Sequence, residues 1–342
     1  MSNRMGIALV GIGPGAVPHL KSLHDLRASI ELRHAIARRP AQADMGPFTG
    51  SLAATSDLQV ALADPLVQAV IVATPPSSHL EIASQCFAAG KHVLLEKPLD
   101  ISVTRAQAIV ARARDAKLRL GVVLQFRFKP GSVALREVLT SGSLGSIQAA
   151  SVRVPWWRPQ SYYDQVGRGT MARDGGGVLL TQAIHSIDLF RSLVGVRSVV
   201  AAQTCRTAVH TMETEDYASA LLTLGNGAPG YLMATTAMMP GLPETIEIIG
   251  ALGSAVLEGG TLRVQFIDGK TLCIASEGGT GSGANIMDFP NDAHRAVLQD
   301  FVDAIEQNRE PAVSGQEGLE TQQLIEKVLA CAGRIDDLRW AS

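Results

Sequence analysis

The chain has 342 residues, 46% of them hydrophobic, a length and composition that suit two domains with a core each. Its 30 Lys and Arg nearly balance its 32 Asp and Glu. This balance argues against a nucleic-acid-binding protein, which would need a dense basic patch. We therefore expect small molecules as partners.

The cysteines are scattered, without the close spacing that a zinc site or a redox dithiol needs, so no metal is expected. The first residues lack the cationic and long apolar segments of a signal peptide, and no stretch approaches the ~18 apolar residues of a membrane span. We expect a cytoplasmic protein without membrane contact. The four cysteines are Cys86, Cys205, Cys273 and Cys331.

Up to residue 125, short apolar runs alternate with segments of helical periodicity. This alternation predicts a doubly wound parallel sheet covered on both faces. Strands are expected at 7–10, 31–37, 69–74, 93–96 and 120–125, and helices at 17–26, 80–89 and 104–117, with a further apolar segment at 58–63.

Beyond residue 145 the pattern changes to strands joined by short glycine turns, typical of antiparallel hairpins. We predict a Rossmann domain at 1–125 and an α+β domain at 126–342 with a large, open, mostly antiparallel sheet. The C-terminal helix is a candidate to pack back on the first domain. Strands are expected at 147–154, 199–206, 217–224, 230–236, 245–249, 255–258 and 262–267, and helices at 177–194, 294–307 and 319–332.

The first apolar run continues into a glycine loop, Gly11-Ile12-Gly13-Pro14-Gly15-Ala16, and then a helix. Backbone N–H groups and a helix N-terminus can meet a pyrophosphate only where no side chain intervenes, so the loop favours dinucleotide binding over a merely structural turn.

The second strand ends in Arg38-Arg39, where NAD-binding domains place a carboxylate. Paired guanidinium donors suit a 2'-phosphate, which favours NADP over NAD; an exposed basic turn is the alternative.

Two further segments follow strand ends: Thr74-Pro75-Pro76 with His79, and Glu96-Lys97-Pro98. In an open α/β sheet this edge is the ligand crevice. Pro98 pushes Lys97 toward an extended backbone and permits a cis bond, which would aim the ammonium in a fixed direction. A structural Glu96–Lys97 pair competes with this interpretation. Gln125, which ends the last predicted strand, is a further candidate cofactor contact.

The helix expected at 177–194 is apolar nearly all round, except for Thr181, His185, Asp188 and Ser192. Their i, i+4, i+7 and i+11 spacing puts them on one face. A lone core histidine is usually structural, but a polar stripe on a buried helix favours a cavity lining. The preceding loop carries Tyr163 and Arg168, which suit a polyhydroxylated ligand or, equally, a domain or subunit contact.

These segments together resemble the Gfo/Idh/MocA oxidoreductase family over nearly the whole chain. The stretches that carry the resemblance are 11–16, 73–79, 89–99 and the run from Gly175 to His185 and Asp188. The resemblance implies a Rossmann domain, a C-terminal domain whose open sheet often forms oligomers, and catalytic roles for Lys97 and His185. Inositol-dehydrogenase members have an aspartate where this chain has Thr181.

We therefore predict an NAD(P)-dependent dehydrogenase or reductase of a sugar, nucleotide sugar or cyclic polyol, working as a homodimer or homotetramer. His185 would take the proton, Lys97 would stabilise the developing oxyanion, and Thr181 would orient the substrate. A redox-neutral NAD-dependent glycosidase and a non-catalytic dinucleotide-binding regulator remain open. Expected cofactor contacts are Gly11, Ile12, Gly13, Pro14, Gly15, Ala16, Arg38, Arg39, Thr74, Pro75, Pro76, His79, Glu96, Lys97 and Gln125; expected substrate contacts are Lys97, Tyr163, Arg168, Thr181 and His185.

Overall fold

The computed structural model describes residues 4–276, 282–283 and 290–333. It divides into two compact units: the first comprises Met1–Gln125 and Pro290–Glu320, the second Phe126–Phe289 and Thr321–Ser342. Residues 290–320 thus belong with the first unit, although the predicted boundaries put them in the second domain. The reason is that helix α10 (Asp292–Glu306) packs its apolar face on α1 and on strand β5 of the first sheet.

The first unit contains a six-stranded, wholly parallel sheet in the order β3-β2-β1-β4-β5-β6. This is the Rossmann strand order, and it confirms the predicted doubly wound sheet. Every residue of β1 is buried, as expected for a strand covered on both faces. The strands are β1 (Met5–Val10), β2 (Ile30–Ile36), β3 (Ala54–Thr55), β4 (Val67–Val72), β5 (His92–Leu95) and β6 (Leu120–Val122).

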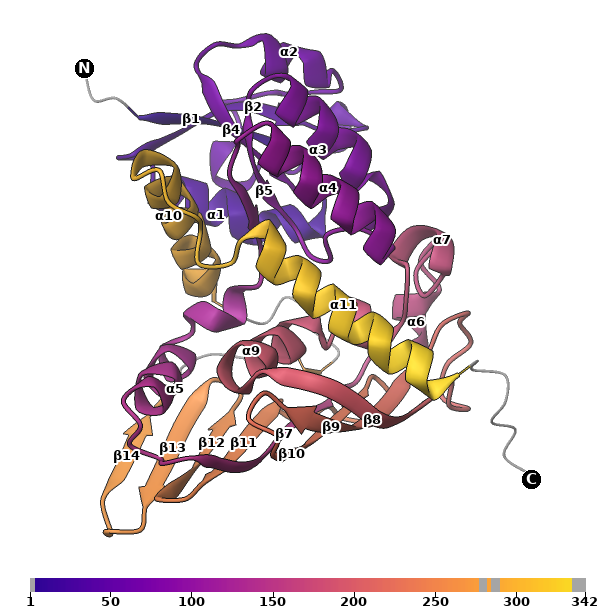
Figure 1. The fold of residues 1–342 in the computed structure, drawn as a ribbon. Coiled ribbons are helices and arrows are strands. Elements are labelled where there is room, and N and C mark those ends of the chain that lie inside the picture. Colours follow the sequence, from indigo (N-terminus) through magenta and orange to yellow (C-terminus); the bar gives the residue numbers. More distant parts are fainter. Residues whose placement is uncertain (1–3, 277–281, 284–289, 334–342) are drawn as a thin grey trace. The chain divides into compact units, whose positions relative to one another are not determined.

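Helices cover this sheet in two groups, with α1 against α10 and α3 against α4 (Figure 1). Right-handed crossovers that leave β1 and β4 in opposite directions place their helices on opposite faces. Asp57 caps α2 and Ser102 caps α4, each accepting a backbone N–H of the first turn. The helices are α1 (Val17–Asp25), α2 (Leu58–Ala63), α3 (His79–Ala88) and α4 (Val103–Asp115).

The second unit contains an eight-stranded sheet in the order β14-β13-β12-β11-β7-β10-β9-β8. Only the β7–β10 pair is parallel, which confirms the mostly antiparallel sheet. The strands are β7 (Ile147–Pro155), β8 (Val196–Cys205), β9 (Tyr217–Leu224), β10 (Pro229–Thr235), β11 (Thr245–Gly250), β12 (Gly253–Glu258), β13 (Thr261–Phe266) and β14 (Thr271–Ile274).

Helices α5 and α9 pack on one face of this sheet (Figure 1). Strand β14 and helix α5 were not predicted from the sequence. The other helices that include residues of this unit are short, apart from α11, whose range crosses the division between the units. The helices are α5 (Pro130–Thr140), α6 (Gln160–Tyr163), α7 (Met171–Asp174), α8 (Val178–Thr181), α9 (Ile184–Val194) and α11 (Gly315–Ala332).

The single helix predicted at 177–194 is wrong, because the chain forms α8, a break at Gln182 and Ala183, and then α9. The break is a wide turn in which the Ala183 N–H donates to the carbonyl of Val178, five residues back, at 2.8 Å. The turn changes the helical phase, so the spacing argument that put Thr181 on the His185 face does not hold. Within the described residues, no helix is long and apolar enough to cross a membrane.

Candidate active site

The glycine loop leaves the carboxyl end of β1 through Gly11, whose φ of +97° favours glycine. A Cβ at Gly11 would lie 2.7 Å from the carbonyl carbon and oxygen of Ala73, so the close approach to the loop after β4 also requires glycine. In contrast, a Cβ at Gly13 or Gly15 would meet no heavy atom of the described chain within 4 Å. The loop therefore presents open backbone just before α1, which fits a dinucleotide pyrophosphate.

The loop after β4 lies beside this turn, because the Ala73 N–H donates to the Val10 carbonyl at 2.7 Å. The switch point of the strand order falls between β1 and β4, where open α/β sheets bind ligands. Thr74, Pro75 and Pro76 are partly exposed here.

His79, predicted as a cofactor contact, is fully buried below these loops. Its Nε2 lies 2.8 Å from the Thr74 carbonyl oxygen, and its Nδ1 lies 3.1 Å from the carbonyl oxygens of Pro98 and Leu99. Burial lowers its pKa, although the carbonyls oppose this effect. The His79 side chain therefore ties the Thr74 loop to the Lys97 loop, which points to a supporting role.

Glu96 holds the backbone of Lys97 at the end of β5. Its Oε2 accepts the Lys97 N–H at 3.1 Å, and its Oε1 lies 2.7 Å from Nε2 of the buried His19. Burial alone would raise the pKa of Glu96, but the His19 hydrogen bond and nearby positive charges lower it overall. The carboxylate thus stays ionised and fixes the loop, and the bond from Lys97 to Pro98 is cis.

The remaining predicted cofactor contacts also follow strand ends. Arg38 and Arg39 are exposed after β2, and neither pairs with a carboxylate within the described residues. Gln125 is buried after β6, and its Oε1 has no hydrogen-bond partner among the described residues. These groups fit the edges of a dinucleotide site.

In the second unit, His185 stands in the first turn of α9 and is 7% exposed. Its ring stacks on Phe126, with centroids 5.1 Å apart and an interplanar angle of 27°. Thr181 ends α8, and its hydroxyl donates to the Gly177 carbonyl at 2.7 Å or to the side-chain oxygen of Gln182.

Tyr162, rather than the predicted Tyr163, is the partly exposed tyrosine of the loop. The Tyr163 hydroxyl lies 2.7 Å from the Thr236 Oγ1, and burial raises the pKa of Tyr163. The Tyr162 hydroxyl accepts from Arg168 at 2.7 Å and from the Gln182 Nε2 at 3.4 Å. Thr181, Gln182, Tyr162 and Arg168 therefore form one polar chain.

Tyr162 and Gln182 were not among the residues predicted from the sequence. The loop sequence does not indicate which of its aromatic residues is buried, and Gln182 lies within the segment predicted as one uninterrupted helix.

Two buried carboxylates support these elements. Asp188 accepts two hydrogen bonds of 2.6 Å from Arg127, so this member of the predicted polar stripe stabilises α9. Glu215 accepts the N–H groups of Gly177 at 3.0 Å and Leu179 at 3.2 Å at the start of α8. Burial raises the pKa of Glu215 to about 7, although these N–H groups oppose the shift.

Comparison with known proteins identifies the family. Residues 5–124 match the model of an oxidoreductase family with an NAD-binding Rossmann fold, and residues 132–256 match the GFO/IDH/MocA C-terminal domain. The chain belongs to the Gfo/Idh/MocA family. It is accordingly an NAD-binding oxidoreductase, as its sequence predicts.

Relatives align over most of its length. An uncharacterised oxidoreductase of Synechocystis is 29% identical, covering 95% of this chain and 93% of that protein. Inositol 2-dehydrogenase of Rhizobium meliloti is 26% identical, covering 78% of each. The WlbA dehydrogenase of Bordetella pertussis, solved with NADH and UDP-GlcNAcA, is 26% identical, covers 96% of both chains and has a TM-score of 0.81.

Proposed function

We propose that this oxidoreductase transfers a hydride between nicotinamide and a CH–OH or ketone group of a sugar, nucleotide sugar or cyclic polyol. The observation that carries the proposal is the edge of the first sheet. There an open glycine turn and a lysine fixed by Glu96 both follow strand ends. The inositol and nucleotide-sugar ligands in the names of its relatives support the same substrate class.

The chemistry divides among three side chains. Nicotinamide, when bound, supplies the group that accepts or returns the hydride. His185 takes the hydroxyl proton in the oxidative direction and returns it in the reductive one, since imidazole titrates nearest neutral pH. Lys97 stabilises the developing negative charge on the oxygen, and Thr181 orients a substrate hydroxyl.

We propose NADP as the preferred cofactor, with NAD as the alternative. Arg38 and Arg39 are exposed after β2 without a carboxylate partner in the described residues, so their donors can take a 2'-phosphate. The relative solved with NADH supports the alternative.

Arg168 and Tyr162 are proposed to contact the substrate through the polar chain that reaches Thr181. A guanidinium beside a phenol offers both directed donors and a stacking face for a sugar. We replace the predicted Tyr163 contact with Tyr162, because the Tyr163 hydroxyl is buried on Thr236.

We also propose a homodimer or homotetramer that assembles through the second sheet. Leu221 and Ile249, each 54% exposed, lie on the sheet face opposite the buried residues of their strands. Tyr231 is opposite Leu221 in the register and adds aromatic surface to that face. Large exposed apolar side chains on one face of a sheet fit a subunit interface.

The test is turnover by Lys97→Ala and His185→Ala, with NADP and NAD binding measured separately by fluorescence. We expect at least a 100-fold fall in kcat for each variant, because each loses a group that acts on the reacting oxygen, with the cofactor Kd nearly unchanged in His185→Ala. Full activity in either variant would remove that residue from the mechanism.

A further inference from the structure

The ring of Phe126 packs against the imidazole of His185 within the second unit. The stacked geometry described above leaves both residues 7% exposed. Stacking fixes the plane of the imidazole while its two nitrogens remain at the ring edge. The orientation of the proposed proton carrier therefore depends on where the Phe126 ring lies.

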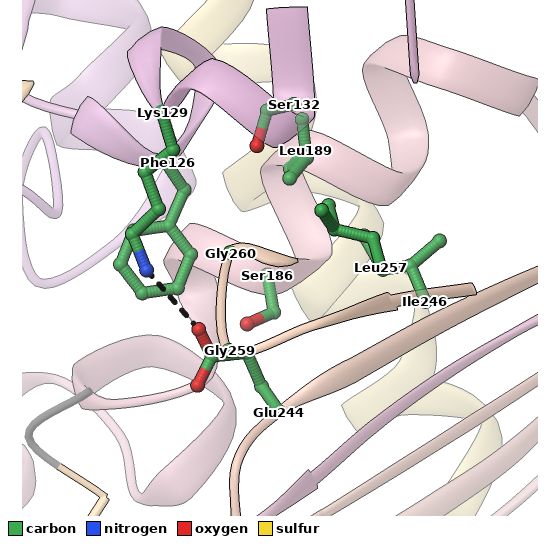
Figure 2. Close-up of a pocket in the computed structure, with 10 residues that line it drawn as sticks. All are labelled: Phe126, Lys129, Ser132, Ser186, Leu189, Glu244, Ile246, Leu257, Gly259 and Gly260. Atoms are coloured by element: carbon green, nitrogen blue, oxygen red, sulfur yellow. Dashed lines mark hydrogen bonds and ion pairs between the residues drawn. The ribbon is translucent and has the colours of Figure 1, made fainter. Parts of the chain in front are cut away.

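Lys129 holds the Phe126 ring. Its Nζ lies 3.6 Å from the ring centroid, well within cation–π range, and 3.2 Å from the Glu244 Oε1 (Figure 2). The other oxygen of Glu244 accepts from the Trp156 indole at 3.3 Å. A chain of contacts thus runs from the end of β7 through Glu244 and Lys129 to Phe126 and His185.

The backbone of Phe126 is fixed by its neighbour. Arg127 forms its double hydrogen bond with Asp188, which stands three residues after His185 on α9. The segment Gln125–Phe128 is therefore tied to the same helix that carries the histidine. Only the rotation of the Phe126 side chain is left to be set by other contacts.

A cavity of about 10 Å³ borders Phe126, enough for about one water molecule (Figure 2). Ser132 and Ser186 also line it, and their buried hydroxyls have no hydrogen-bond partner within the described residues. The ring is therefore incompletely packed on this side, where small displacements cost less than in a fully packed core. The Lys129 ammonium, held by Glu244, opposes such displacements.

We propose that Phe126 is a positioning residue for His185, and that the Lys129–Glu244 pair keeps its ring against the imidazole. The catalytic consequence rests on the proposed function, in which His185 moves the proton. The positioning itself does not, since it concerns only contacts inside the second unit.

The positioning is tested by NMR on protein with labelled histidine, using His185→Gln to assign the ring signals. An aromatic face shifts the protons of a stacked ring upfield, so Phe126→Leu should move the His185 ring protons downfield. Phe128→Leu is the matched control, because Phe128 lies in the same short helix and makes no aromatic contact within the described residues. Unchanged His185 signals in Phe126→Leu would overturn the proposal whatever the enzyme's activity.

Kinetics test the consequence. We expect kcat to fall about 10-fold in Phe126→Leu, because small misplacements of a catalytic group have effects of this size or larger, while the substrate KM changes less than 2-fold. The kcat of Phe126→Tyr and of Lys129→Arg should stay near the wild-type value, whereas the kcat of Lys129→Met should fall in part. Equal losses in the Leu and Tyr variants, or a loss confined to KM, would refute the catalytic consequence, while the NMR shifts decide the positioning itself.

Discussion

The pair formed by Arg127 and Asp188 is the contact in the second unit on which stability should depend most. The Arg127 Nε and Nη2 each donate to Asp188 at 2.6 Å, and the Thr321 hydroxyl donates to the same carboxylate at 2.8 Å. The two charged side chains are only 5% and 0% exposed. In Asp188→Leu the guanidinium stays buried without its counter-ion.

The magnitude follows from that burial. Removing one partner of a buried ion pair costs about 3–5 kcal/mol, and Thr321 loses an acceptor worth about 1 kcal/mol. We therefore expect Asp188→Leu to lower the free energy of unfolding by roughly 5 kcal/mol, or Tm by roughly 10–20 °C for a unit of this size. Adding Arg127→Met removes the stranded charge, so the double variant should recover most of the loss.

Urea unfolding followed by circular dichroism measures these differences. Glu258→Leu is the control, because Glu258 pairs with Arg263 in the same unit while both side chains are about half exposed, and such pairs contribute under about 1 kcal/mol. The reasoning fails if Asp188→Leu unfolds at the wild-type midpoint. It fails equally if the double variant is no more stable than Asp188→Leu alone.

Three further predictions concern cofactor choice, pH and thiol reactivity. Arg38→Ala should raise the KM for NADP about 10-fold and leave the KM for NAD unchanged; equal changes for both cofactors would discard the phosphate contact. Because burial raises the folded-state pKa of Glu215 from 4.5 to about 7, the folded state binds this proton more tightly than the unfolded state. As pH rises from 5 to 8, the free energy of unfolding of the wild type should therefore fall relative to that of Glu215→Gln, by up to roughly 3 kcal/mol. Urea unfolding at several pH values measures this difference, and a difference that does not change with pH would refute the raised pKa of Glu215. Burial also raises the pKa of Cys86 to about 12, so a thiol reagent should leave this residue unmodified in the folded protein; mass spectrometry should find the label first on the exposed Cys273 and Cys331.

The sequence was sufficient to predict most strands of both sheets, because local patterns specify them. Short apolar runs alternating with helical periodicity predicted the parallel strands, and apolar segments joined by short glycine turns predicted the antiparallel ones. The two-residue β3 is too short to carry either signal. The predicted boundaries put residues 290–320 with the second domain, because an amphipathic helix shows that it packs on something, but not on which sheet.

The candidate site was less predictable, because its details depend on partners far apart in the chain. His19 and Glu96 are 77 residues apart, and Arg127 and Asp188 are 61 residues apart. No local pattern indicates such pairs. Adjacent residues of one type pose a related problem, since Tyr162 and Tyr163 differ only in which one the tertiary structure buries.

Three carboxylates of this protein hold elements in place beside the proposed catalytic groups. Glu96 holds the N–H of Lys97, and Glu215 holds the start of α8, which ends at Thr181. Asp188 holds the segment that carries Phe126. Because each of these three carboxylates is used in this way, and Thr181 stands where inositol-dehydrogenase members have an aspartate, none of the three is proposed to share a proton with His185. The proposed mechanism therefore assigns proton transfer to the imidazole alone, and its orientation, rather than a second acid, becomes the property that the surrounding residues must control.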